Sequence, residues 1–66
     1  MSMGATLREL RGKTSQRIAA EGIGINKSSL AMYERDERTP RDEVKARIAK
    51  YYGVPIQDIF FADIEY

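Results

Sequence analysis

The chain is poor in side chains that could carry out covalent or acid–base chemistry. Its 66 residues include no Cys and no His, so it lacks a thiolate, the commonest metal ligand and the commonest general base. Carboxylates remain, but no pair of them is distinguished as an acid and a base, and so short a chain leaves little room for a deep pocket. We therefore expect a protein that is not an enzyme and that uses no metal, cofactor or small-molecule ligand.

Charged side chains are divided unevenly along the chain. Residues 1–35 carry six basic and three acidic groups, whereas residues 36–66 carry five basic and seven acidic groups. This division favours one face for a polyanion and another for a different partner, although ordinary solvated charge would give the same balance. No apolar run approaches the ~20 residues of a membrane span, and the N-terminus lacks a signal peptide's hydrophobic core. We expect a soluble cytoplasmic protein, associated with the nucleoid if it binds DNA, with no membrane partner.

Helical periodicity recurs along the chain and convincing strand alternation does not, which predicts a compact all-α bundle of five short helices. We treat residues 1–66 as one domain. Leu7 and Leu10 indicate a first helix over about 5–12. Pro40 and Asp42 open a fourth helix that ends at Gly53, and a short fifth helix covers the segment PIQDIFF. Residues 62–66 form a short tail.

The second and third helices are separated by only a few residues. Ser15 is a suitable N-cap for the helix in SQRIAAEGI, because its hydroxyl can accept a hydrogen bond from an unpaired backbone amide. Gly24 suits the left-handed position just past that helix. Asn26 caps a third helix that runs to about Arg35. The spacing therefore predicts that one helix ends and another begins within a tight turn.

The third helix has an unusual outer face. At about 100° per residue, Leu30 and Tyr33 lie on the side expected to face the core. The opposite arc carries Lys27, Ser28, Ala31, Met32 and Arg35. Small side chains permit close approach to another surface, Lys can reach a phosphate or a guanine edge, and Ala and Met can contact a thymine methyl. An ordinary solvated surface would also explain this arc, and geometry alone leaves both interpretations open.

The order of residues from Ser15 to Pro40 resembles the helix-turn-helix of the XRE family, the class of lambdoid phage repressors and Cro proteins. The residues that carry the pattern are Ser15-Gln16, Ala20, Ile23-Gly24, Asn26, Leu30 and Tyr33-Glu34-Arg35. The segments LRELRGKTSQ and RIAKYYGVPIQDIFF are similar to the family's outer helices, so the resemblance runs from about Leu7 to Phe61. It implies a lambda-repressor-like DNA-binding domain with a central helix-turn-helix at about 15–35.

The resemblance also implies a function and contact residues. In the family the recognition helix enters the major groove of double-stranded DNA. Base-contacting positions are then Lys27, Ser28, Ala31 and Met32. Phosphate-contacting positions are Gln16, Arg17, Ser29, Arg38 and Arg41. The implied function is a sequence-specific transcriptional regulator that represses by occupying its operator. The alternative is a protein-interaction module, such as an antitoxin or antirepressor, on the same fold.

Four residues are given architectural roles. Gly24 makes the turn and Asn26 caps the recognition helix. By the resemblance, Arg11 of the first helix pairs with Glu34 near the end of the third in a semi-buried site. Two separate surface charges are the alternative.

Three features depart from the family pattern. Ala19 replaces the usual Leu and Ile18 a usual polar residue, so either the second helix is rotated or Ile18 is partly exposed. Gly22 lies inside that helix, where it should cost about 1 kcal/mol relative to Ala. Asp36 takes a position usually held by Gly, and we expect Asp36→Gly to raise the melting temperature.

The C-terminal part is rich in aromatic and aliphatic side chains, more than so small a core should bury. The resemblance implies that members dimerise through the C-terminal helices on pseudo-palindromic operators. We expect a homodimer whose interface draws on Tyr52, Ile56, Ile59, Phe60 and Phe61.

Overall fold

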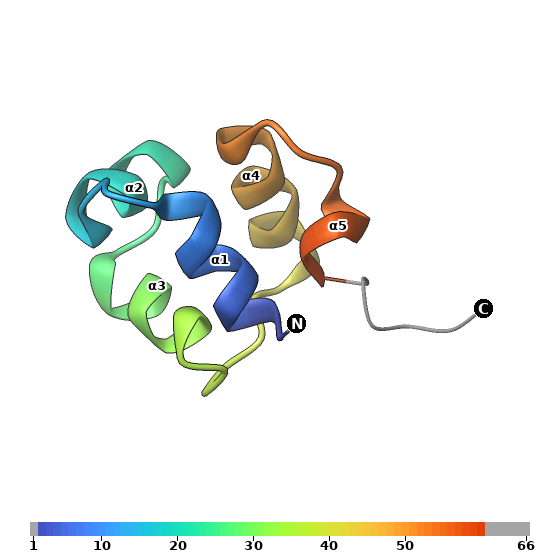
Figure 1. Cartoon of the computed structure of the whole chain (residues 1–66), viewed down its shortest axis with the longest axis horizontal. Coiled ribbons are helices and arrows are strands. Elements are labelled where there is room, and N and C mark those ends of the chain that lie inside the picture. Colours follow the sequence, from blue (N-terminus) through green and yellow to red (C-terminus); the bar gives the residue numbers. More distant parts are fainter. Residues whose placement is uncertain (1, 61–66) are drawn as a thin grey trace.

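A computed structural model describes residues 2–60 as five helices without a strand (Figure 1). These are α1 (Met3–Arg11), α2 (Gln16–Ile23), α3 (Lys27–Glu34), α4 (Asp42–Tyr52) and α5 (Ile56–Phe60). Helix α1 packs against α3 and α5, α2 packs against α3 and α4, and α4 packs against α5. The predicted all-α bundle of five helices is confirmed. Within residues 2–60, no helix is both long enough and apolar enough to cross a membrane.

The core is formed by one set of apolar side chains contributed by all five helices. Its buried members are Leu7, Ala19, Ala20, Ile23, Leu30, Ile48, Ala49 and Ile59. Small residues of α2 allow this helix to lie close to its neighbours. Ala19 is fully buried and Ile18 is 50% exposed. Of the two possibilities for this departure, the structure therefore shows an exposed Ile18.

Side-chain caps fix where the first three helices begin. The hydroxyl of Ser2 accepts a hydrogen bond from the Ala5 amide, so α1 begins at Met3 and not near residue 5. Ser15 accepts from the Ile18 amide and Asn26 from the Ser29 amide, at 3.1 and 2.7 Å. Both caps were predicted, because Ser and Asn oxygens can satisfy amides that a helix leaves unpaired.

Three helices end in the same backbone motif. The left-handed residues at the ends of α2, α3 and α4 are Gly24, Asp36 and Gly53, and their φ angles are 90°, 59° and 70°. In each case the following amide bonds a carbonyl five residues back, as when the Glu37 amide donates to the Met32 carbonyl at 3.0 Å. This pattern is the Schellman motif, which needs a left-handed residue and favours glycine there. Asp36 is the one non-glycine residue among the three.

Gly22 allows α4 to approach α2 closely. A Cβ placed on Gly22 would lie 2.2 Å from Cε1 of the Tyr51 ring, much closer than a van der Waals contact permits. The close approach of Tyr51 explains why glycine stands at this position. The local sequence does not show this, because Tyr51 lies on a different helix. Its cost to helix propensity is offset by the packing of Tyr51.

The predicted dimer residues have different positions in the fold. Ile59 is 3% exposed and lies in the core, so its assignment to an interface is wrong. The short helix α5 turns this side chain inward, against the buried residues of the other helices. Tyr52, Ile56 and Phe60 are partly buried and pack at the margin of the core. Phe61 and the predicted tail at 62–66 lie outside the described residues.

Candidate nucleic-acid interface

The outer face of α3 is a shallow hollow. It encloses about 290 Å³ and is lined by Lys27, Ser28, Ala31, Met32 and Arg35. The inner face of α3 holds Leu30 and Glu34, both buried. The four residues predicted to contact bases therefore share one surface with Arg35, which the sequence placed on the same arc without assigning it a contact.

The side chains that line the hollow differ in polarity and exposure. Lys27, Ser28 and Arg35 are exposed, whereas Ala31 and Met32 are half-buried. Positive charge at both ends suits an anionic partner, and the apolar middle suits methyl groups or base edges. The side chains of Ala31 and Met32 offer no hydrogen-bond donor, so a base above them would be recognised by shape and apolar contact.

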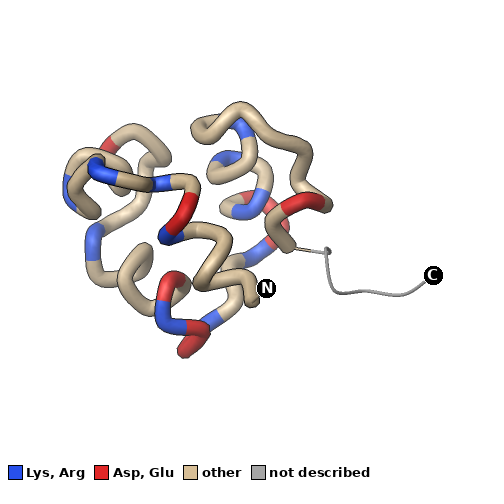
Figure 2. Tube along the Cα trace, viewed as in Figure 1, with Lys and Arg blue, Asp and Glu red and all other residues tan. Residues whose placement is uncertain are grey.

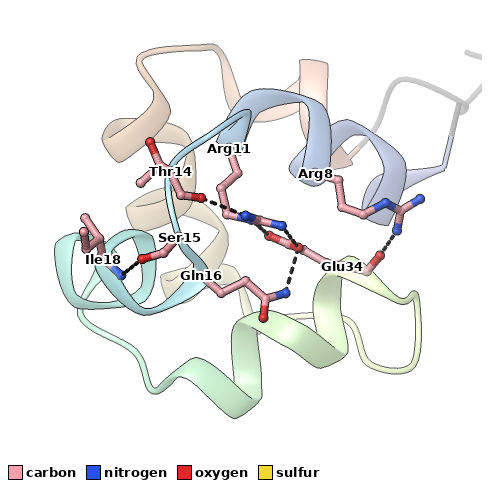
Figure 3. A network of polar contacts seen from close by, with 7 residues as sticks. All are labelled: Arg8, Arg11, Thr14, Ser15, Gln16, Ile18 and Glu34. Atoms are coloured by element: carbon pink, nitrogen blue, oxygen red, sulfur yellow. Dashed lines mark hydrogen bonds and ion pairs between the residues drawn. The ribbon is translucent and has the colours of Figure 1, made fainter.

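A buried carboxylate holds α3 in place (Figure 3). Glu34 is 1% exposed. Its Oε2 accepts from Arg11 Nε at 2.7 Å, and its Oε1 accepts from Arg11 Nη2 at 3.0 Å. Gln16 Nε2 also donates to Oε1, at 3.0 Å. The predicted Arg11–Glu34 pair is present, and Gln16 of α2 joins it, so one carboxylate connects three helices.

The surroundings of this pair affect two titrating groups. The hydrogen bond from Arg11 to Glu34 raises the pKa of the Arg11 guanidinium above its usual value. Burial, with a smaller contribution from the charge of Glu34, raises the pKa of the Tyr52 hydroxyl to about 12. That hydroxyl is buried and has no hydrogen-bond partner among residues 2–60. A buried hydroxyl without a partner costs free energy, whereas both oxygens of the Glu34 carboxylate are hydrogen-bonded.

The C-terminal end of α3 is fixed against α1. The Gly4 amide donates to Asp36 Oδ1 at 2.9 Å, and the Arg8 guanidinium donates to the Glu34 carbonyl. A Cβ on Gly4 would lie 2.4 Å from that carbonyl oxygen, so only glycine permits the approach. These contacts, which the sequence did not reveal, set the position of α3 and of the segment that follows it.

The predicted phosphate-contacting residues surround α3 without forming one cluster. Gln16 and Arg17 lie at the start of α2, Ser29 lies on α3, and Arg38 and Arg41 lie between α3 and α4. Arg17, Arg38 and Arg41 are the basic members of this set, and Figure 2 shows basic positions along α2 and in the segment between α3 and α4. Arg17 forms a long, exposed pair with Glu21 at 3.4 Å. The Gln16 amide donates one of its two hydrogens to Glu34.

Arg35 forms an ion pair at the end of the hollow. Its Nε donates to Glu37 Oε2 at 2.5 Å and its Nη2 to Glu37 Oε1 at 3.2 Å. The hydrogen bond from Arg35 lowers the pKa of the Glu37 carboxyl below its usual value. Sequence reasoning gave no partner to either residue. Their spacing of two along the chain becomes a contact only because the Schellman motif turns the backbone there.

Comparison with known proteins identifies the family of the chain. The model of the Helix-turn-helix family matches residues 5–59. The cryptic phage CTXphi transcriptional repressor RstR of Vibrio cholerae is 36% identical over 55 residues, covering 80% of this chain and 50% of that repressor. The chain thus spans about half the length of this relative. No solved structure gives a significant match. The sequence-based recognition and the lambda-repressor-like fold are confirmed, and the chain belongs to the XRE family of helix-turn-helix regulators.

Proposed function

We propose that this chain is a sequence-specific DNA-binding transcriptional repressor that places α3 in the major groove of its operator. The observation that carries the proposal is the hollow on α3, where Lys27, Ser28, Ala31 and Met32 form one surface. The relative from Vibrio cholerae is named a transcriptional repressor, which supports the repressor mode. Occupation of a promoter by the bound protein is the simplest mechanism.

In this proposal, residues around α3 fix the register on the DNA backbone. Gln16, Arg17 and Ser29 contact phosphates from one side of α3, and Arg38 and Arg41 from the segment after it. Such contacts position the helix and carry no sequence information. Base edges are read by Lys27, Ser28, Ala31 and Met32.

We also propose that the protein binds as a homodimer through its C-terminal helices. Tyr52, Ile56 and Phe60 retain partial exposure at the margin of the core. Helices α3 and α5 lie on opposite sides of α1 (Figure 1). A dimer formed through the α5 side would leave α3 available for DNA.

Selection from a random DNA library tests the proposal. We expect enrichment of a motif with two inverted half-sites, about 10 base pairs apart from centre to centre, because the recognition helices of a dimer enter successive major grooves. One half-site alone would support DNA reading without the dimer. A library that shows no enriched sequence would contradict sequence-specific binding.

A second candidate function rests on a separate apolar surface. Ile18 is 50% exposed and Tyr51 39% exposed, and Tyr51 packs over Gly22, one helical turn from Ile18. Such a surface suits a protein-interaction module. A salt titration on random-sequence duplex discriminates the two functions. A DNA-binding protein loses affinity steeply with salt, since it releases counterions from several phosphates, whereas a protein-interaction module should barely bind.

A further inference from the structure

The hollow on α3 is flanked by two cations that differ in their surroundings. Lys27, at its first turn, makes no ion pair within residues 2–60, whereas Arg35, at its end, is paired with Glu37. The pair uses the Nε and Nη2 hydrogens of Arg35, which is one of the forks with which an arginine recognises two acceptor oxygens. The same fork would bind a phosphate or the O6 and N7 atoms of guanine.

The position of Glu37 is fixed by the backbone. Its amide donates to the Met32 carbonyl at 3.0 Å, and Asp36 before it has a left-handed φ of 59°. These two features are the Schellman end of α3, so the Glu37 side chain emerges beside Arg35. The carboxylate is held at the rim of the proposed DNA-reading surface by the fold of the helix end.

We propose that Glu37 competes with DNA for the Arg35 guanidinium, so that Arg35 contacts a phosphate or guanine edge only after this pair opens. The inference rests on the proposed function and adds Arg35 and Glu37 to the residues that determine it. Both side chains are about half exposed, at 56% and 52%. Pairs this exposed are weak, so DNA can open this one, and Glu37 lowers DNA affinity without preventing binding.

The test compares the wild-type chain with Glu37→Gln on a 30-base-pair random-sequence duplex, by fluorescence anisotropy at several salt concentrations. We expect Glu37→Gln to bind about two- to fivefold more tightly. Its plot of log affinity against log salt should steepen by about 0.9 where Arg35 neutralises one more phosphate. Tighter binding with an unchanged slope would assign the released Arg35 to a guanine edge. Glu9→Gln is the matched control, since it removes an equal charge from an exposed position on α1 and should change binding much less.

A second background separates competition for Arg35 from general repulsion by Glu37. In Arg35→Gln, the additional substitution Glu37→Gln should give no more tightening than Glu9→Gln does. If the tightening persists unchanged without Arg35, or if Glu37→Gln weakens binding, competition for Arg35 is overturned. Wild-type protein that binds with a steep salt dependence but does not respond to Glu37→Gln overturns this inference alone. Wild-type protein that shows no salt-dependent binding overturns the proposed function as well.

Discussion

Glu34 is the residue on which the position of α3 depends most. It is fully enclosed, and its two oxygens accept three hydrogen bonds, two from Arg11 and one from Gln16. A buried charge is tolerated only when it is paired and its remaining acceptor positions are used. Since the same helix carries the proposed base-contacting residues, loss of this carboxylate should disturb both stability and DNA reading.

We therefore predict that Glu34→Gln lowers the free energy of unfolding by about 3–5 kcal/mol, because it leaves the Arg11 guanidinium without its partner in a semi-buried site. Urea denaturation followed by circular dichroism measures the change. Glu21→Gln is the control, because Glu21 forms an exposed pair with Arg17 and its removal should cost less than about 1 kcal/mol. A loss below half a kcal/mol for Glu34→Gln would refute the role of the pair.

Tyr52 is a residue whose replacement should not lower the stability at neutral pH. Its hydroxyl is buried without a partner among the described residues, so Tyr52→Phe should leave the melting temperature at pH 7 unchanged or raise it. Burial raises the pKa of the hydroxyl to about 12, above the usual value of about 10. The unfolded chain therefore loses this proton first, and wild-type stability should fall as pH rises from about 10 to 12. Tyr52→Phe should lack that part of the decline, and thermal melts across this range compare the two.

Asp36 shows how a contact distant in sequence reverses an expectation. Its left-handed φ of 59° is a small cost that glycine would remove. However, its carboxylate also accepts the Gly4 amide in the first turn of α1 at 2.9 Å, and a hydrogen bond to a charged group contributes about 1.5–3 kcal/mol. We now expect Asp36→Gly to lower the melting temperature. Asp36→Asn, which tolerates the same φ and keeps an acceptor, should lower the melting temperature less. A higher melting temperature for Asp36→Gly would show that the left-handed φ costs more than the hydrogen bond to Gly4 contributes.

At the scale of elements, the contact between α2 and α4 rests on one missing side chain. A Cβ at position 22 would overlap the Tyr51 ring. Gly22→Ala should therefore destabilise the wild-type chain, although alanine favours a helix by about 1 kcal/mol over glycine. In a Tyr51→Ala background the overlap is gone, and the same substitution should stabilise. Denaturation of the four proteins gives the sign in each background, and equal effects in both would show that the ring moves aside freely.

The helix boundaries were predictable wherever a local rule sets them. Ser15, Asn26, Gly24 and Gly53 act within their own helix ends, through one cap oxygen or one positive φ. The first helix begins earlier than its apolar spacing predicts, because Ser2 caps it. The arc on α3 was also predictable, because helical periodicity alone brings its five residues to one side.

The remaining features depend on contacts between segments distant in the chain. The C-terminal part holds more apolar side chains than so small a core is expected to bury, which predicts an interface role for Ile59, yet Ile59 is buried. The role of Gly22 requires Tyr51, and the position of α3 requires Gly4 and Arg8. None of these pairs follows from composition or period. The pair of Arg11 and Glu34 was the exception, since the family resemblance supplied what local patterns could not.

At the scale of the whole molecule, the fold separates two kinds of surface. Helix α3, which packs against α1 and α2, presents the hollow flanked by cations. Helix α5, which packs against α1 and α4, presents partly buried apolar side chains. The proposed DNA and dimer contacts therefore use different helices, and a substitution can affect one without the other.

Because the proposed DNA contacts lie apart from the proposed dimer contacts, variants can address DNA binding alone. Two of them distinguish phosphate contacts from base contacts. Arg41→Gln should weaken binding to every duplex by a similar factor and reduce the salt slope by about 0.9, because it removes one neutralised phosphate. Met32→Ala should leave that slope unchanged and alter the order of preference among duplexes that differ by single bases. Lys50→Gln, on the last turn of α4, is the control for net charge and should bind nearly as the wild type does. A Met32→Ala variant that weakens all duplexes equally would remove Met32 from the residues that read bases, even if Arg41 behaves as expected.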